Sequence, residues 1–211
     1  PNKIVGAYGD GGIVTTDDPD LAEEVRLWGS YGETRDFEQV GPVKLLAPMD
    51  HIVEGYHSHL DTLQAAVVLA KLPHVPAWIA RRQAIAALYG ELLADSNVVT
   101  PHVPAGFGHV YRNYVVLVAN RHEVRRALAR WGVETHVLYA PAVHLKALYR
   151  RLGYHPGDLP VTEEIAEQVL CLPIYPELTD EQIRYVADCL MEATQGSSLS
   201  LGAGPRAQRG S

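Results

Sequence analysis

Residues 58–94 constrain the fold most, because two helical patterns follow each other there with prolines between them. The pattern Ser58-x-x-Asp61 has the form of a capping box and predicts the start of the first helix. Pro73 and Pro76 interrupt it, since proline lacks the N–H that a helix interior needs. The second helix is predicted to have one face made of Trp78, Arg81, Ile85, Leu88 and Leu92. We interpret the stretch as a long bent connector between two domains.

The part of the chain before this connector is predicted to hold one strand, one helix and a long irregular stretch. A β-prone run predicts a strand over residues 12–16. Asp18 can cap a helix that has Pro19 at its first position and that Gly29 ends. Residues 29–56 keep neither a helical nor a strand period, and so long an irregular stretch is usually functional or covered by a partner.

The part after the connector has the pattern of an α+β domain. Strands are predicted at residues 97–99, 111–118 and 135–139, and an extended segment at 172–176. Three helices are predicted. The first follows the cap Asn120-x-x-Glu123 and ends at Gly132, and the second runs from Thr162 to Val169. The third follows the cap Thr179-x-x-Gln182. The core face of the last helix is expected to be Ile183, Val186, Ala187, Leu190 and Met191.

Composition excludes several classes of protein. The apolar share of 47% and the charged share of 20% are those of a globular chain. A formal charge of −7 argues against a nucleic-acid or anionic-membrane partner, since either needs a basic face. Cys171 and Cys189 lack Cys-x-x-Cys spacing, and Cys189 falls on a helical pattern, so reduced, packed thiols are expected. No signal peptide or uninterrupted apolar span is recognised, and we predict a soluble, cytoplasmic protein.

Lys3 is the first candidate for chemistry. It is one of four lysines, and small and apolar residues surround it before the turn of residues 9–12. A lysine in apolar surroundings loses solvation of its ammonium, which lowers its pKa and frees the amine as a nucleophile. From the residues alone, a solvated lysine near a chain end remains the alternative. The turn matches no phosphate-binding fingerprint and is interpreted as a tight turn.

The histidines and acidic residues give weaker candidates. His57-x-His59, with His51 nearby, would suggest a metal site, but no carboxylate or cysteine stands at a familiar zinc spacing, so no metal is predicted. His144 lies in a loop that prolines and aromatic residues would hold rigid, with a surface histidine as the alternative. The pair Glu163-Glu164 is interpreted as a charged first helical turn. Serine hydrolase motifs are absent from the sequence.

Several motifs together resemble one family. The chain begins with Pro1-Asn2-Lys3-Ile4-Val5-Gly6-Ala7-Tyr8-Gly9-Asp10-Gly11-Gly12, which resembles the Pro-x-Lys-Asn-Leu-Gly-Ala-x-Gly-Asp-Gly-Gly segment of the DegT/DnrJ/EryC1/StrS aminotransferases. The later segment Gly55-Tyr56-His57-Ser58-His59-Leu60-Asp61 is similar to their Gly-Tyr-Asn-x-Arg-Leu-Asp. Residues 71–74, 139–144 and 170–179 match further family motifs in the same order.

The resemblance implies a fold and its boundaries. The chain is expected to be α/β, the C-terminal half of a fold-type-I aminotransferase that depends on pyridoxal 5'-phosphate. Residues 1–75 would complete the large cofactor-binding domain, and residues 76–195 would form the small α+β domain. Residues 196–211 are predicted to be a disordered tail because their composition is rich in Gly, Ser, Ala and Arg.

The resemblance also implies an activity and its residues. Lys3 would be the Schiff-base lysine that holds pyridoxal 5'-phosphate, and His57 would contact the cofactor phosphate of the neighbouring subunit. Tyr139 and His144 would bind the substrate. The implied reaction transfers an amino group, from glutamate in most of the family, to a nucleotide-linked keto sugar in amino-sugar biosynthesis. A homodimer is implied, since the family builds each cofactor site from two subunits.

This chain departs from the family pattern in ways that matter for activity. His57 and His59 stand where the family commonly has Asn and Arg, although a histidine can donate the same hydrogen bond. Residues 29–54 are longer than usual. The aspartate that pairs with the cofactor ring nitrogen lies upstream of Lys3 in the family. If the 211 residues were the whole protein, we would expect a broken cofactor site. The alternative function is therefore an inactive homologue that acts as a binding or assembly partner.

Overall fold

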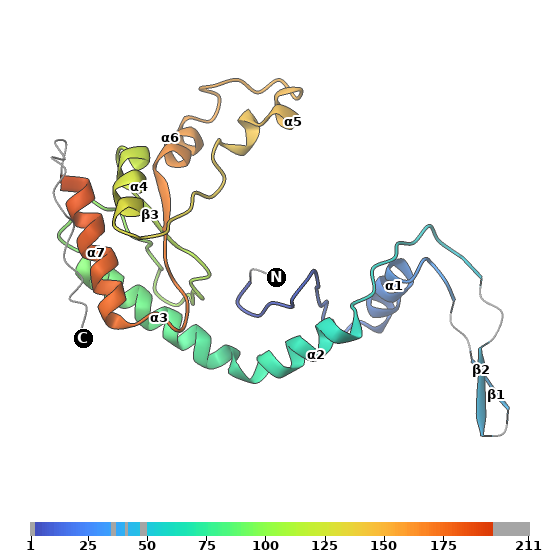
Figure 1. The fold of residues 1–211 in the computed structure, drawn as a ribbon. Coiled ribbons are helices and arrows are strands. Elements are labelled where there is room, and N and C mark those ends of the chain that lie inside the picture. Colours follow the sequence, from blue (N-terminus) through green and yellow to red (C-terminus); the bar gives the residue numbers. More distant parts are fainter. Residues whose placement is uncertain (1–2, 35–36, 41, 47–49, 196–211) are drawn as a thin grey trace. The chain divides into compact units, whose positions relative to one another are not determined.

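The computed structural model describes residues 3–34, 37–40, 42–46 and 50–195, which is where every statement below applies. The chain divides into two compact units, Pro1–Pro73 and His74–Ser211, which we call unit 1 and unit 2 (Figure 1). The segment predicted to be a disordered tail lies outside the described residues.

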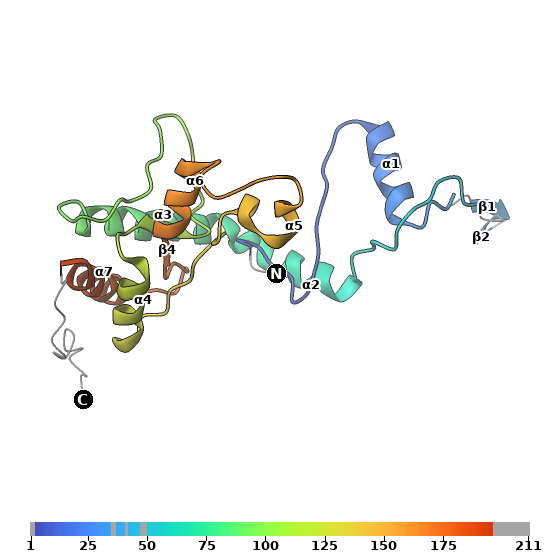
Figure 2. The same cartoon turned by 90° about the horizontal axis from the view of Figure 1, so that it is seen from above.

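Unit 1 contains two helices and a hairpin. Helix α1 spans Pro19–Gly29, and its first backbone N–H groups donate to the Asp18 side chain, from Asp20 at 3.0 Å and from Leu21 at 3.2 Å. The predicted cap of this helix is therefore confirmed. Strands β1 (Phe37–Val40) and β2 (Val43–Leu46) pair antiparallel, and helix α2 spans Thr62–Lys71 (Figure 2).

The segments on either side of the hairpin are held against each other by backbone hydrogen bonds. The Tyr31 N–H donates to the Tyr56 carbonyl at 3.0 Å, and the Ser58 N–H donates to the Gly29 carbonyl at 3.0 Å. We call these paired segments, residues 28–34 and 50–58, the unit 1 ladder. The prediction that residues 29–56 are irregular is thus wrong in part. The two segments pair with each other although they are far apart in sequence, and such pairing produces no local period.

Unit 1 has almost no core of its own. Among its described residues, Ala7 is the one hydrophobic residue that is buried. The exposed fractions of the apolar side chains on its helices are large, 41% for Trp28, 81% for Leu63 and 67% for Leu69. Burial of apolar surface is the dominant stabilising term in folding, and unit 1 obtains little of it from its own described residues.

Unit 2 contains the core. Its helices and turns are η1 (Leu72–His74, at the boundary between the units), α3 (Val75–Leu92), α4 (Arg121–Arg130), η2 (Val143–Leu145), α5 (Ala147–Arg150), α6 (Pro160–Gln168) and α7 (Asp180–Gln195). Strands β3 (Tyr114–Leu117) and β4 (Val169–Leu172) pair antiparallel, with Tyr114 opposite Leu172 and Leu117 opposite Val169. Helix α7 packs against α3 and α4 (Figure 1).

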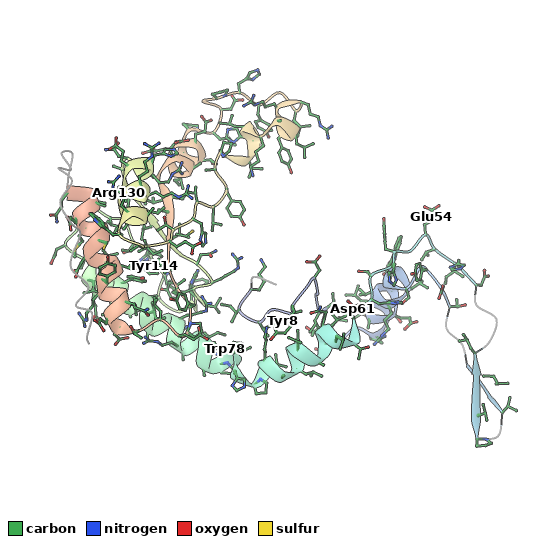
Figure 3. All side chains as sticks on the ribbon, in the orientation of Figure 1. Tyr8, Glu54, Asp61, Trp78, Tyr114 and Arg130 are labelled. Atoms are coloured by element: carbon green, nitrogen blue, oxygen red, sulfur yellow. The ribbon has the colours of Figure 1, made fainter. Side chains whose placement is uncertain are left out.

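The apolar periodicity of the helices explains which faces lie in that core. The largest fully buried side chains include Ile85 and Tyr89 of α3, Leu128 of α4, and Ile183 and Leu190 of α7. Tyr114 of β3 lies in unit 2 (Figure 3), and its exposed fraction is 2%.

Three of the predicted strands and one helix start are wrong. Residues 12–16 belong to no described strand, and residues 97–99 and 135–139 contribute only the isolated bridges of Val99 to Leu117 and of His136 to Cys171. Their β-prone composition lacks a full ladder partner, and propensity alone does not make a strand. Helix α2 begins at Thr62, after Asp61, so Ser58 does not cap it. Helix α4 begins after Asn120 as predicted, but the Asn120 side chain makes no capping hydrogen bond, so that predicted cap is wrong.

Other predicted features are confirmed. Gly132, with φ of +76°, follows the end of α4, as expected. The capping box of α7 is formed, since the Thr179 N–H donates to Gln182 at 3.0 Å and the Gln182 N–H donates to the Thr179 hydroxyl at 3.2 Å. Cys171 and Cys189 are free and buried, and burial raises the pKa of the Cys171 thiol to about 11.

By length and composition alone, the helical run Thr62–Leu92 could cross a membrane, with a mean hydropathy of 1.3 in its most apolar window. This is weak support for a membrane span, because the core helices of water-soluble proteins pass the same test. The second half of the run, α3, places Ile85 and Tyr89 in the core of unit 2. The absence of a membrane partner stays a prediction.

Candidate functional site

The segment that carries Lys3 is anchored on α2. The Tyr8 N–H donates to the Gln64 side chain at 2.8 Å, and the Lys71 ammonium donates to the Gly6 carbonyl at 2.6 Å. The same ammonium lies 4.5 Å from the centre of the Tyr8 ring. These contacts fix the path of the segment just after Lys3, whose own side chain is exposed.

Two glycines of this segment allow its close approach to residues near α2. A Cβ on Gly9 would lie 3.1 Å from the Gln64 side-chain nitrogen, and a Cβ on Gly11 would lie 3.0 Å from a methyl group of Leu60. Larger residues at these positions would require the Gln64 and Leu60 side chains to shift. The two glycines thus allow close packing of the segment, whereas residues 9–12 form no hydrogen-bonded turn, so the predicted tight turn is wrong.

A cofactor that carries an aldehyde needs an accessible primary amine for covalent attachment. Lys3 fits this requirement, because its side chain is exposed and none of the described hydrogen bonds or ion pairs uses its amine. Lys71 fits less well, because its ammonium already contacts the Gly6 carbonyl and the Tyr8 ring. The residues present therefore fit attachment at Lys3.

His57 and His59 lie beside Tyr31 at the edge of the unit 1 ladder. The His57 ring stacks on the Tyr31 ring with centres 5.0 Å apart, and the His59 ring meets the His57 ring edge-on at 5.1 Å. His59 also contacts the Ser30 hydroxyl at 2.8 Å. Both histidines are exposed, so a ligand can reach either imidazole.

The ladder that carries these rings needs glycine at a close backbone approach. A Cβ on Gly55 would lie 2.1 Å from the Gly32 nitrogen, and a Cβ on Gly32 would lie 1.9 Å from the Val53 carbonyl oxygen. Gly32 also has φ of +72°, which disfavours residues with a side chain. The ladder therefore places His57 through backbone contacts that only glycine permits.

A histidine metal site gains no support from the geometry. The described residues contain no group of three or more His, Cys, Asp or Glu side chains that could hold a metal ion. His51 contacts the Tyr31 carbonyl at 3.2 Å through its Nδ1. The absence of a metal stays a prediction.

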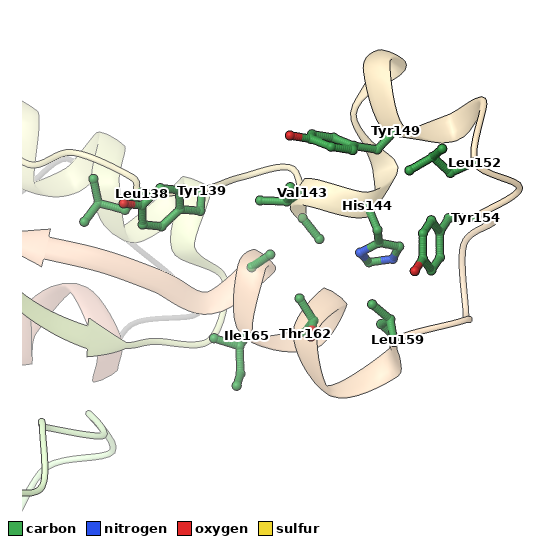
Figure 4. Close-up of a pocket in the computed structure, with 12 residues that line it drawn as sticks. Leu138, Tyr139, Val143, His144, Tyr149, Leu152, Tyr154, Leu159, Thr162 and Ile165 are labelled. Atoms are coloured by element: carbon green, nitrogen blue, oxygen red, sulfur yellow. The ribbon is translucent and has the colours of Figure 1, made fainter. Parts of the chain in front are cut away.

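Unit 2 holds the predicted substrate-binding residues at one pocket of about 440 Å³ (Figure 4). Tyr139 lines its mouth with an exposed fraction of 73%, whereas His144 is buried, at 6%. The surface alternative for His144 is therefore wrong. The lining contains Leu, Ala, Val, Ile, Thr, Tyr and His side chains and no Asp, Glu, Lys or Arg.

Glu163, predicted only as part of a charged first helical turn, lies in contact with His144. Its carboxylate lies 3.1 Å from His144 Nε2 and accepts hydrogen bonds from the N–H groups of Gly157, at 2.9 Å, and Leu159, at 3.3 Å. The bond from the Gly157 N–H, and after it the bond from His144, lower the pKa of Glu163. Acidic residues are common in the first turn of a helix because they interact favourably with its dipole, so the sequence gives no sign of the contact with His144.

The chain matches known proteins over most of its length. The sequence profile of the DegT/DnrJ/EryC1/StrS aminotransferase family matches residues 1–191. The chain is 38% identical to the erythromycin biosynthesis sensory transduction protein EryC1 of Saccharopolyspora erythraea, over 88% of this chain and 48% of that protein. It is 37% identical to a pleiotropic regulatory protein of Geobacillus stearothermophilus, over 91% of this chain and 49% of that protein.

Solved structures agree with this relation. The crystal structure of S. venezuelae DesV in complex with a ketimine intermediate is 34% identical and superposes with a TM-score of 0.81, over 92% of this chain and 50% of that chain. A DegT DnrJ EryC1 StrS aminotransferase from Brucella abortus is 31% identical, with a TM-score of 0.79, over 93% of this chain and 49% of that one. The chain thus spans about half the length of the relatives it matches, and the predicted fold-type-I class is confirmed.

Proposed function

Because the chain belongs to the DegT/DnrJ/EryC1/StrS aminotransferase family, we propose that it supplies the lysine-bearing part of an enzyme that aminates a nucleotide-linked keto sugar. The amino donor is glutamate or a similar amino acid, and pyridoxal 5'-phosphate is the cofactor. The observation that carries the proposal is the placement of Lys3, whose exposed amine follows the family motif on a segment anchored to α2.

Each residue then has a role toward bound groups. When bound, pyridoxal 5'-phosphate supplies the electron sink that stabilises negative charge at the donor Cα. Lys3 would hold the cofactor through its amine, and the same amine would move the proton at the donor Cα. His57 would donate a hydrogen bond to the cofactor phosphate of the neighbouring subunit. Tyr139 and His144 bind the sugar at the pocket of unit 2.

We also propose that the protein is a cytoplasmic homodimer. The exposed apolar side chains of Trp28, Leu63 and Leu69 support association, since unit 1 buries so little of its own apolar surface. The two cysteines, which are free, suit a reducing compartment. Sedimentation of the purified protein tests the dimer, and a monomer at all concentrations would contradict it.

The chemical test is trapping with borohydride after pyridoxal 5'-phosphate is added. It is made on the 211-residue chain and on a form extended to the length of the relatives. In the extended form we expect a visible absorption band and one reduced adduct, on Lys3 and not on Lys71. An adduct spread evenly over the lysines, or no band in the extended form, would refute the assignment of Lys3.

A second function has a specific observation in its favour. Two relatives at 37% and 38% identity carry names of regulatory or signalling proteins rather than of enzymes. An inactive homologue that serves as a binding or assembly partner would give no adduct in either form. The trapping experiment therefore separates the two functions.

A further inference from the structure

Glu163 joins three separate parts of unit 2 at the pocket. One oxygen of its carboxylate lies 3.1 Å from His144 Nε2 and 2.9 Å from the Gly157 nitrogen, and the other also lies 2.9 Å from the Gly157 nitrogen. The Leu159 N–H donates to the first oxygen at 3.3 Å. The exposed fraction of the Glu163 side chain is 21%, so the carboxylate is partly shielded from solvent.

The charge state of the carboxylate decides which ring nitrogen of His144 carries a proton. An ionised carboxylate only accepts hydrogen bonds, and the hydrogen bonds around Glu163 favour its ionised form. His144 Nε2 must then be the donor, and in the neutral imidazole Nδ1 is the acceptor. Nδ1 has no hydrogen-bond partner among the residues that the structure describes, while the imidazole lines the pocket.

The same carboxylate also holds the chain segment that borders the pocket. Residues 154–159 turn back from α5 toward α6, and the Gly157 and Leu159 N–H groups of this segment both donate to Glu163. Tyr154 from this segment meets the His144 ring edge-on, with centres 5.8 Å apart, and Leu159 lines the pocket (Figure 4). One side chain thus fixes both the histidine and the wall beside it.

We propose that Glu163 is a positioning residue that holds His144 with its proton on Nε2, so that Nδ1 accepts a hydrogen bond from a sugar hydroxyl in the pocket. The part about the sugar rests on the proposed function, whereas the proton position and the segment contacts do not. The ligand group is an uncharged hydroxyl, since the pocket lining has no cationic side chain to pair with an anion.

The first test observes the His144 ring by nitrogen-resolved NMR of the full chain at neutral pH. We expect an Nε2–H proton that is visible because its bond to Glu163 protects it from exchange, and an unprotonated Nδ1. A proton on Nδ1, alone or together with Nε2, would overturn the proposal. This measurement needs no variant, so it decides the proton position even if substitutions at Glu163 prevent folding.

The second test compares Glu163→Ala with Glu164→Gln. Glu164 lies on the same helix and accepts only from Gln168, at 3.2 Å, so it is a matched control. In Glu163→Ala we expect the Nε2–H signal to disappear and the Gly157 amide to exchange several-fold faster, because its hydrogen-bond acceptor is lost. In the control Glu164→Gln, the Nε2–H signal and the exchange of the Gly157 amide should stay as in the wild type. An Nε2–H signal that survives in Glu163→Ala would refute the positioning role.

The third test separates this role from the proposed function. In the extended form, the half-reaction with the amino donor should keep its rate in Glu163→Ala, while the half-reaction with the keto sugar should slow at least tenfold, with a raised KM. Equal loss in both half-reactions would indicate general damage and would overturn the specific role toward the sugar. If the wild type itself aminates no sugar, the proposed function fails, and the two NMR tests still decide the proton position.

Discussion

The anchor of the Lys3 segment can be tested by the substitution Lys71→Met. Methionine keeps most of the side-chain length but removes the ammonium, which donates to the Gly6 carbonyl at 2.6 Å and lies 4.5 Å from the centre of the Tyr8 ring. The hydrogen bond from the Tyr8 N–H to the Gln64 side chain, at 2.8 Å, then remains. The segment should therefore open more often.

The size of the effect follows from the two lost contacts. A hydrogen bond to a charged group contributes about 1.5–3 kcal/mol net. A cation–π contact at an exposed site contributes about 0.5–1 kcal/mol. Tyr8 is 79% exposed, so the lower ends apply and the sum is about 2 kcal/mol. Each 1.4 kcal/mol is a factor of ten, so the open population should rise roughly 10- to 30-fold.

Hydrogen exchange of the Tyr8 amide measures this opening directly, because that amide donates within the anchor. We expect its exchange to accelerate by the same roughly 10- to 30-fold in Lys71→Met. Lys146→Met is the control, since Lys146 is exposed and its side chain makes no described contact. Acceleration below about threefold, or an equal change in the control, would show that the ammonium does not anchor the segment.

Three further predictions concern stability. Tyr89→Phe removes a hydroxyl that donates to a backbone carbonyl at 3.0 Å, and should lower the free energy of unfolding by about 1–3 kcal/mol in urea titration; an unchanged midpoint would contradict it. Gly55→Ala places a Cβ 2.1 Å from the Gly32 nitrogen and should speed amide exchange across the unit 1 ladder, whereas protection equal to the wild type would disprove the close approach. The pKa of Glu163 is below its ordinary 4.5, so the stability that its ionised carboxylate contributes is complete above pH 4.5 and is lost as the pH falls through the lowered pKa. The NMR chemical shift of the Gly157 amide should change over the same pH range, and a titration midpoint above 4.5 would argue against this prediction.

Local sequence patterns were sufficient to predict features whose hydrogen bonds join residues close together in the chain. The Asp18 cap of α1 and the Thr179–Gln182 capping box of α7 form as predicted, because each bond joins residues within one helical turn. The order of the motifs from Lys3 onward likewise indicated the family, which the match over residues 1–191 confirms. The roles of Lys3, His57, Tyr139 and His144 stay predictions.

The predicted strands show where local signals failed. Residues 12–16 have β-prone composition, but a strand exists only through a partner, and its described surroundings supply none. The unit 1 ladder shows the converse, since its two segments have no period of their own and pair across the hairpin between them. Strand pairing depends on two segments that are distant in sequence, so the pattern of one segment does not predict it.

The sequence was sufficient to predict the caps of α1 and α7, the buried face of α7 and the family. It predicted the buried face of α3 only in part, because Tyr89 lies in the core outside the predicted face. The tertiary structure alone decided that His144 is buried, that Glu163 contacts it across 19 positions of sequence, and that the same carboxylate binds the Gly157 N–H. An acidic side chain in the first turn of a helix interacts favourably with the helix dipole in any protein. Its hydrogen-bond partners, in contrast, depend on which loop the fold brings to that helix.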